Sequence, residues 1–210
     1  METIGLGKRS AIQIVYPGVD LSKFEPRPKT VDPSILYLGR LKPYKSIDRL
    51  IAAFSQVVKD IPNATLTIAG VGESRLELEG TTKNLGLQNV VKFLGRVGEK
   101  AKAELLASSW ILAQPSKIEG WGITVIEANA SGTPVIASDV PGLRDSVRNP
   151  HTGLLVTWDN QGKWTDAIVK MIKDQNLRTS MEAESLVWAK HFSWEKSAKK
   201  LIEILEEEVS

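Results

Sequence analysis

Pro115-Ser-Lys-Ile-Glu-Gly-Trp-Gly-Ile-Thr-Val-Ile-Glu-Ala-Asn-Ala-Ser-Gly-Thr-Pro-Val-Ile-Ala137 is the stretch around which the rest of this chain is organised. It begins as a loop that leaves one strand, passes through a glycine-spaced turn and continues as a short helix. Apolar residues at helical spacing from Ile123 predict that helix, and Gly132 followed by Pro134 is a usual helix stop. A strand exit, a turn and a helix start in this order are typical of a ligand site.

The turn Glu119-Gly120-Trp121-Gly122 favours an anion at its end. Its two glycines remove side chains where a phosphate could approach the main chain. Free amides at residues 122–124 and the positive end of the helix dipole attract negative charge, the dipole by roughly 0.3–1 kcal/mol at an exposed site. Glu119 precedes the helix and Glu127 lies one turn inside it, so the two carboxylates can face opposite sides of the phosphate. The same features also occur in ordinary solvated turns.

The composition is that of a soluble globular protein, with 42% hydrophobic and 25% charged residues in a chain of 210. No apolar run approaches the roughly 18 residues of a membrane span, and residues 1–10 are too polar for a secretory signal, so we expect a cytoplasmic protein. The absence of cysteine excludes disulfides and thiol catalysis, and His151 and His191 are too few for a histidine metal cage. A net charge of +2 without a dense basic stripe argues against nucleic acid as a partner.

Short apolar runs alternate with helical patterns along most of the chain. The expected strands are residues 11–15, 35–38, 66–69, 90–94, 110–113, 135–137 and 154–156. The expected helices are one capped by Ser46 and ended by Pro62, residues 73–85, residues 99–106, one from 123 to the stop at 132, and several from 161 onward, the last over 194–207. This alternation predicts an α/β fold, with one doubly wound parallel sheet covered by helices on both faces and with C-terminal helices.

Three parts are expected along the chain. Residues 1–33 form an N-terminal strand and a connector, because three prolines among charged residues exclude regular structure between 22 and 33. Residues 34–190 form the α/β domain, and residues 191–210 form a C-terminal helix.

Polar and glycine-rich loops follow four of the expected strands, where a ligand sits in an open parallel sheet. They are residues 39–40, 70–72, 95–97 and 115–122. Arg40 offers a planar fork for phosphate oxygens and Lys45 a mobile point charge, so the pair matches a diphosphate. Two solvated loop cations would be the ordinary interpretation. Their position on the same sheet edge as the helix start at Gly122 favours the diphosphate.

The sequence from Gly70 to Arg75 half-matches the dinucleotide fingerprint. Arg75 replaces the third glycine, and the next strand ends without the acidic residue that a ribose would need. A nicotinamide enzyme is therefore not expected. Gly70 and Gly72 are interpreted as a strand-to-helix turn that can approach a nucleotide base.

Several of these motifs occur together in one known family. In chain order they are residues 38–41 (Leu-Gly-Arg-Leu) with Lys45, residues 68–73 (Ile-Ala-Gly-Val-Gly-Glu), residues 93–95 (Phe-Leu-Gly), Glu119 and Glu127 with seven residues between them, and residues 132–136 (Gly-Thr-Pro-Val-Ile). Over about residues 16–156 the chain resembles the C-terminal, nucleotide-sugar-binding half of retaining family 4 glycosyltransferases, which have the GT-B fold. It departs from them at Pro17, where asparagine is usual, and at Ser46, where glycine is common.

The resemblance implies a Rossmann-like donor domain and assigns roles to particular residues. Arg40 and Lys45 would hold the donor diphosphate and Glu119 would contact the transferred sugar, which makes these three the catalytic candidates. Glu127 would take the ribose hydroxyls, and the backbone of residues 96–97 would meet the base. The complete set of expected donor-binding residues is Gly39, Arg40, Lys45, Gly70, Gly72, Arg96, Val97, Glu119, Gly120, Trp121, Gly122, Ile123, Thr124 and Glu127. No metal is expected at the donor, because the cations and the helix dipole neutralise the leaving diphosphate.

In such enzymes a second, amino-terminal domain binds the acceptor, and this chain begins at about the connector. The acceptor-binding domain is therefore expected on the missing half or on a separate chain. The resemblance also implies a UDP- or GDP-sugar as donor and no other cofactor. The missing half would also make any peripheral membrane contact, and the last helix would cross back onto it. The expected reaction is hexosyl transfer with retention at the anomeric carbon.

Two other functions remain open at this point. A nucleotide-sugar epimerase of the same fold would need catalytic acids and a histidine in the cleft. A non-catalytic nucleotide-sugar-binding subunit would use the same residues as an enzyme.

Overall fold

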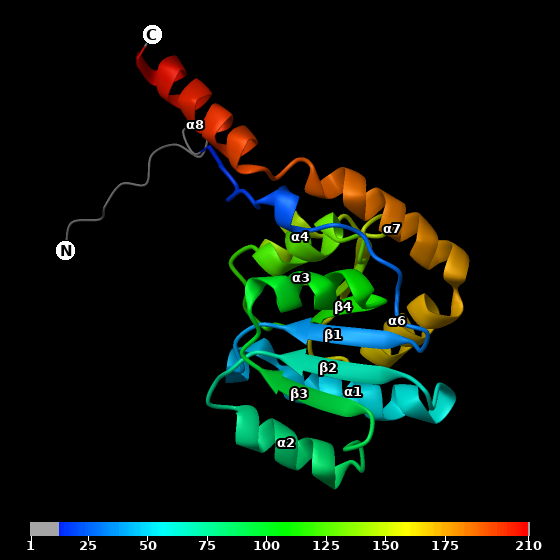
Figure 1. The fold of residues 1–210 in the computed structure, drawn as a ribbon. Helices are drawn as coiled ribbons and strands as arrows, with labels where there is room; N and C mark the ends of the chain where they lie inside the picture. The colour runs from blue at the N-terminus through cyan, green and yellow to red at the C-terminus, as the bar shows by residue number, and fades with distance from the viewer. Residues whose placement is uncertain (1–12, 210) are drawn as a thin grey trace, which may run out of the picture.

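Six parallel strands form the centre of the structure, a computed structural model that describes residues 13–209 (Figure 1). In spatial order they are β3 (Val91–Gly95), β2 (Thr65–Ala69), β1 (Ser34–Leu38), β4 (Ile111–Gln114), β5 (Val135–Ser138) and β6 (Gly153–Val156). The chain winds from β1 toward β3 and then, after returning to the centre, from β4 toward β6. The topological switch point therefore lies between β1 and β4, where ligands bind in open α/β sheets.

Helices cover both faces of the sheet, which confirms the predicted α/β fold (Figure 1). One face carries α1 (Ile47–Asp60), α2 (Arg75–Asn84) and α6 (Gln161–Lys173). The other face carries α3 (Glu99–Ser108), α4 (Ile123–Ala130) and α5 (Pro141–Ser146). α7 (Gln175–Ala189) packs against both α4 and α6.

Successive residues of the central strands point into two separate hydrophobic cores. In β1, Ile35 and Tyr37 belong to the core under α1 and α6, whereas Leu36 and Leu38 belong to the core under α3 and α4. Because helices cover both faces, every residue of β1 is buried. A central strand therefore has to be a continuous apolar run, which is the pattern that identified it in the sequence.

The structure corrects the prediction at the start of the chain and after β5. Residues 13–15 lie outside any strand, while Ala11, Ile12 and the residues 1–10 discussed as a leader are outside the described part of the chain. The first pairing comes later, as a parallel bridge between Val19 and Ser193. Helix α5 was not expected, because its six residues contain too little periodicity to indicate a helix.

A half-buried lysine anchors the connector, which contains the short helix η2 (Leu21–Lys23), to the sheet domain. Lys29 Nζ donates to the backbone oxygens of Ala107 and Gly132, both at 3.0 Å, and to the hydroxyl of Thr133 at 2.6 Å. Ala107 is in the last turn of α3, and Gly132 follows α4, where helix carbonyls carry partial negative charge. One ammonium therefore fixes the connector to two helices of the same face.

The last helix, α8 (Trp194–Val209), projects away from the sheet (Figure 1). Its exposed apolar side chains are Trp194, Leu201, Ile202 and Leu205. Among the residues that the structure describes, none of the helices combines the length and the apolar composition that crossing a bilayer requires.

We expect Lys29→Met to lower the free energy of unfolding by about 1.5–3 kcal/mol, because it removes a charged donor from three partly buried oxygens. Chemical denaturation followed by circular dichroism measures the change. Lys23→Met is the matched control, since Lys23 lies in the same connector with a side chain that is 56% exposed. Its replacement should change stability by no more than about 0.5 kcal/mol. Equal losses in both variants would contradict the anchoring role.

Candidate functional site

The carboxyl edge of the sheet at the switch point brings several predicted site residues together. The loop after β1 contains Gly39, Arg40 and the short helix η3 (Pro43–Lys45), and the loop after β4 runs into the turn at Glu119. A backbone hydrogen bond of 2.8 Å from the Lys117 amide to the Tyr44 oxygen joins these two loops. The cations of one loop and the acid of the other therefore lie next to each other.

Lys45 and Glu119 form an ion pair that the sequence did not indicate. Lys45 Nζ lies 2.5 Å from Glu119 Oε2, and the two side chains are only 11% and 17% exposed. The buried Ser116 hydroxyl donates to the same carboxylate oxygen at 3.1 Å. The sequence had assigned the two residues to different parts of a donor, the diphosphate and the sugar. Because an ammonium has three donors, Lys45 can keep Glu119 in place and still bind an anion.

Tyr44 lies between the two predicted phosphate-binding cations. Its hydroxyl accepts a hydrogen bond of 2.7 Å from the exposed guanidinium of Arg40. Its ring centroid is 5.3 Å from Lys45 Nζ and 6.0 Å from the Arg40 guanidinium carbon. A tyrosine in a loop gives no signal of this role, so the sequence missed it.

Ser46 does not cap α1 in the way expected. It occupies the N-cap position, but its φ of 51° and ψ of 38° are left-handed, and its side chain makes no capping bond within the described chain. This conformation costs a non-glycine residue roughly 1–2 kcal/mol. Position 46 therefore favours glycine for conformational reasons. Glycine is also the residue common at this position in the family that the sequence resembles.

The turn before α4 uses its two glycines differently. Gly122 has a φ of +79°, and a Cβ there would lie 2.7 Å from the Leu143 side chain of α5. At Gly120 a Cβ would meet nothing within 4 Å among the described atoms, so the main chain there faces open space. α4 begins at Ile123 as predicted, although Ile123 is 43% exposed and does not join the buried face. The first amides of α4 are then free to bind an anion.

Trp121, predicted as a donor-binding residue, places its side chain in the core. It is 9% exposed and stacks on Tyr16 of the connector, with ring centroids 5.6 Å apart. Phe192, which follows α7, meets it edge-on at 5.1 Å. The Trp121 ring therefore packs the turn against the connector at Tyr16 and against Phe192 after α7. Only the backbone of Trp121 can then contribute to a ligand site beside Gly120.

Glu127 is buried in α4 and paired with a lysine of α3. Lys102 Nζ lies 2.7 Å from Glu127 Oε1 and 3.1 Å from Glu99 Oε2. Burial raises the pKa of the Glu127 carboxyl above its ordinary value, and the Lys102 ammonium opposes that rise. For the less buried Lys102, burial lowers the pKa, but the bonds to Glu127 and Glu99 outweigh it, so the pKa of Lys102 is raised.

Gly70 and Gly72 are explained by packing between loops. A Cβ at Gly70 would lie 1.8 Å from the Gly39 oxygen, and one at Gly72 would lie 2.1 Å from the Leu41 oxygen. The loops after β1 and β2 therefore meet backbone to backbone. The loop after β3 adds the exposed Arg96 and the half-buried Val97 to the same sheet edge.

The two histidines lie away from these loops. His151 precedes β6, at the amino edge of the sheet, and His191 follows the end of α7. An epimerase would need a histidine in the cleft, and neither position provides one.

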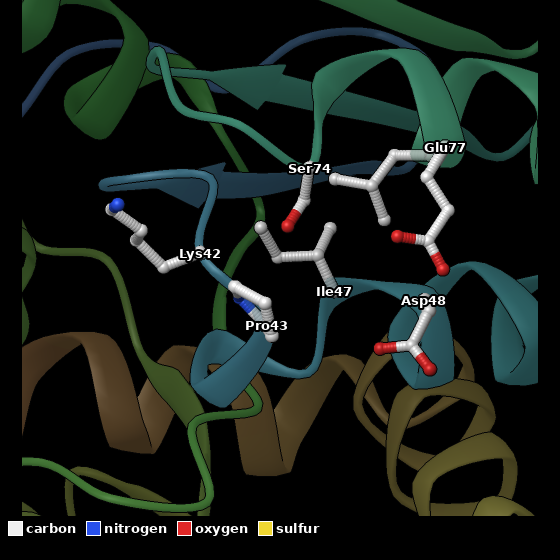
Figure 2. Close-up of a pocket in the computed structure, with 7 residues that line it drawn as sticks. Lys42, Pro43, Ile47, Asp48, Ser74 and Glu77 are labelled. Atoms are coloured by element: carbon white, nitrogen blue, oxygen red, sulfur yellow. The ribbon is translucent and has the colours of Figure 1, made fainter.

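A pocket lies beside the site, between the starts of α1 and α2 (Figure 2). It is lined by Lys42, Pro43, Ile47, Asp48, Ser74, Glu77 and Leu78. Figure 2 shows Glu77 extending from α2 toward the start of α1, where Asp48 lies. Lys42 is paired with Glu73 at 2.7 Å. The pocket therefore offers mainly acidic groups and suits a phosphate less well than the edge that carries Arg40.

Comparison with known proteins agrees with this geometry. The family model described as Glycosyl transferases group 1 matches residues 19–188. A D-inositol 3-phosphate glycosyltransferase of Rhodococcus erythropolis is 33% identical in an alignment 209 residues long. That alignment covers 91% of this chain and 47% of that protein. The chain thus spans about half the length of the curated relatives it matches.

Two solved structures share the fold. HepE of Anabaena, in complex with UDP-glucose, superposes with a TM-score of 0.85 at 24% identity, over 96% of this chain and 59% of that chain. The C-terminal domain of the group 1 glycosyl transferase LpcC from Francisella tularensis gives a TM-score of 0.74 at 24% identity, over 82% of this chain and 97% of that chain. Because the model of this family matches residues 19–188, which are most of the chain, this chain belongs to the glycosyl transferases group 1, and it has the fold of the C-terminal domain of the family's GT-B members.

Proposed function

We propose that this chain is the donor half of a retaining glycosyltransferase and binds a UDP- or GDP-sugar at the β1–β4 switch point. The observation that carries the proposal is the pairing of Lys45 with Glu119 just before α4, with Arg40 bonded to Tyr44 in the same loop as Lys45. Two cations and a helix start provide the charge that a diphosphate requires, and an adjacent acid can accept sugar hydroxyls. The shared fold with HepE, solved with UDP-glucose, and the 33% identity to a glycosyltransferase support a nucleotide-sugar donor.

In this proposal each part of the donor binds to residues of a different loop at the sheet edge. Arg40, Lys45 and the amides of Gly122, Ile123 and Thr124 hold the diphosphate. Glu119 binds hydroxyls of the transferred sugar, while Glu127 binds the ribose. The backbone near the expected base-binding residues Gly70, Gly72, Arg96 and Val97 receives the base. Gly39 contributes to donor binding beside Arg40, and Gly120 and Trp121 contribute backbone to the phosphate turn.

Transfer then breaks the bond between the anomeric carbon and the diphosphate oxygen and forms a bond from that carbon to the acceptor oxygen on the same face. The acceptor proton passes to the departing phosphate oxygen. Arg40, Lys45 and the α4 dipole stabilise the charge that develops on the leaving group, so these side chains act most strongly in the transition state.

The acceptor binds to a second domain, supplied by an amino-terminal half or by a partner chain. In this proposal residues 1–33 are the connector to that domain, residues 34–190 bind the donor, and the helix of residues 191–210 packs toward the acceptor half. The exposed apolar face of α8 supports this assignment.

Arg40→Ala should weaken binding of the UDP- or GDP-sugar about ten- to a hundredfold, because one charge-assisted contact contributes about 1.5–3 kcal/mol. Titration calorimetry with both donors measures the loss. Arg27→Ala is the control, since Arg27 is 55% exposed and pairs with Glu104 at the connector. Donor affinity unchanged by Arg40→Ala would contradict the proposed diphosphate site.

Glu127→Gln should weaken the nucleoside diphosphate and the sugar nucleotide alike, because both contain the ribose. Glu119→Gln should weaken mainly the intact sugar nucleotide. It also releases Lys45, so affinity for the diphosphate alone should hold or rise. Calorimetry of the two variants with UDP and UDP-glucose, or the GDP pair, separates the roles. The same pattern of losses in both variants would refute this division.

The chain alone should bind the donor and hydrolyse it slowly at most, without transferring sugar to an acceptor. Positioning of the acceptor hydroxyl lowers a barrier by roughly 7–11 kcal/mol when it is complete, and one half of the cleft provides almost none of this. Addition of the amino-terminal half of a related enzyme, fused at the connector, should restore transfer. A robust transfer rate from the 210-residue chain by itself would contradict the two-half arrangement.

A further inference from the structure

Lys102 is the one lysine of α3 that turns inward to a predicted ligand-binding acid. The sequence Glu99-Lys-Ala-Lys102 gave no reason to single it out from its neighbours. In the structure its side chain is 17% exposed and lies 2.7 Å from Glu127 Oε1. Lys100, by contrast, is exposed on the same helix.

The carboxylate that Lys102 contacts needs a cationic partner. Glu127 is 9% exposed in a helix whose residues from Val125 to Ala130 are all buried. A buried carboxylate without a partner takes up a proton, because desolvation disfavours its charge. A protonated acid accepts hydroxyls less well and turns one oxygen into a donor. Lys102 therefore favours the ionised form of Glu127 as the form that contacts a ligand.

The contact leaves the other carboxylate oxygen available. Lys102 donates to Oε1, while Oε2 of Glu127 accepts no hydrogen bond from any residue between 13 and 209. Holding one oxygen also fixes the rotation of the carboxylate. Oε2 is then a pre-oriented acceptor with two lone pairs.

Lys102 is itself held from two sides. Its ammonium lies 5.4 Å from the ring centroid of Phe24, which is buried at the end of the connector helix η2. Glu99, one turn earlier, pairs with it at 3.1 Å, but the Glu99 side chain is 71% exposed. The position of Lys102 therefore depends mainly on Phe24 and Glu127.

We propose that Lys102 is a positioning residue for the donor: it keeps Glu127 ionised and oriented so that Oε2 receives a ribose hydroxyl. The inference rests on the proposed function, and it deepens that function by naming the residue that sets recognition of the ribose. A purely structural ion pair would stabilise the contact between α3 and α4 without affecting which pentose is bound.

The test compares ribose with a pentose that lacks its hydroxyls. UDP and GDP are titrated into the full chain by calorimetry, each beside its 2′,3′-dideoxy analogue, and the ratio of the two affinities is measured. The variants are Lys102→Met, Lys102→Arg as the conservative replacement, Glu127→Gln, and Lys100→Met as the matched control, because Lys100 is an exposed lysine of the same helix. Thermal unfolding of each variant reports separately on the fold.

Lys102→Met should weaken the ribonucleotide about tenfold and the dideoxy analogue less than about twofold, so that the preference for ribose is lost. Glu127→Gln should remove the same preference. Lys102→Arg should retain most of it, and Lys100→Met should leave it unchanged.

The outcomes separate this inference from the function on which it rests. If Glu127→Gln removes the ribose preference and Lys102→Met does not, the positioning role is wrong while the donor site stands. If Lys102→Met weakens both nucleotides equally, its role is structural and the inference is overturned. If Glu127→Gln leaves the preference intact, the ribose assignment falls and the inference with it. A chain that binds neither nucleotide overturns the proposed function itself.

Discussion

The reversal of winding between β1 and β4 is the constraint on which the rest of the structure depends. Because the chain leaves these neighbouring strands in opposite directions, a crevice opens between the crossovers that follow them, and the loops after β1 and β4 border it. One loop brings Arg40 and Lys45, and the other brings Glu119 and the start of α4. The backbone hydrogen bond from the Lys117 amide to the Tyr44 oxygen holds these two loops next to each other. A site that needs cations and acids from distant parts of the sequence is thereby assembled by topology.

The two acids at this edge are each paired with a lysine. Glu119 is held by Lys45 and Ser116, and Glu127 is held by Lys102. Each pair takes one side chain from the half of the fold that begins at β4 and one from an element before it in the chain. For Glu127, pairing opposes the desolvation that disfavours the charged carboxylate. Pairing also restricts the rotation of both carboxylates, so a ligand meets oriented acceptors and loses less free energy in ordering them.

Backbone geometry could be predicted from the sequence more completely than side-chain geometry. β1 and α4 were recognisable because a buried central strand is continuously apolar, and because Gly132 and Pro134 stop a helix. The ion pair between Lys45 and Glu119 joins residues 74 positions apart, and no periodicity encodes a contact of that separation. Trp121 was placed at the ligand because of its neighbours in sequence, whereas the ring packs between Tyr16 and Phe192. Lys102 carried no local signal, since one helix lysine resembles another until a tertiary partner is known.

The bridge between Val19 and Ser193 has a consequence for how such domains evolve. Val19 also donates its amide to the Phe192 oxygen at 2.7 Å, so the segments by which the chain enters and leaves the sheet domain lie side by side. A domain attached at two adjacent points can be exchanged as a cassette, because the distance between its junctions does not change with its interior. Recombination at these two positions would combine this sheet domain with a different neighbouring module while leaving the core of the sheet domain intact.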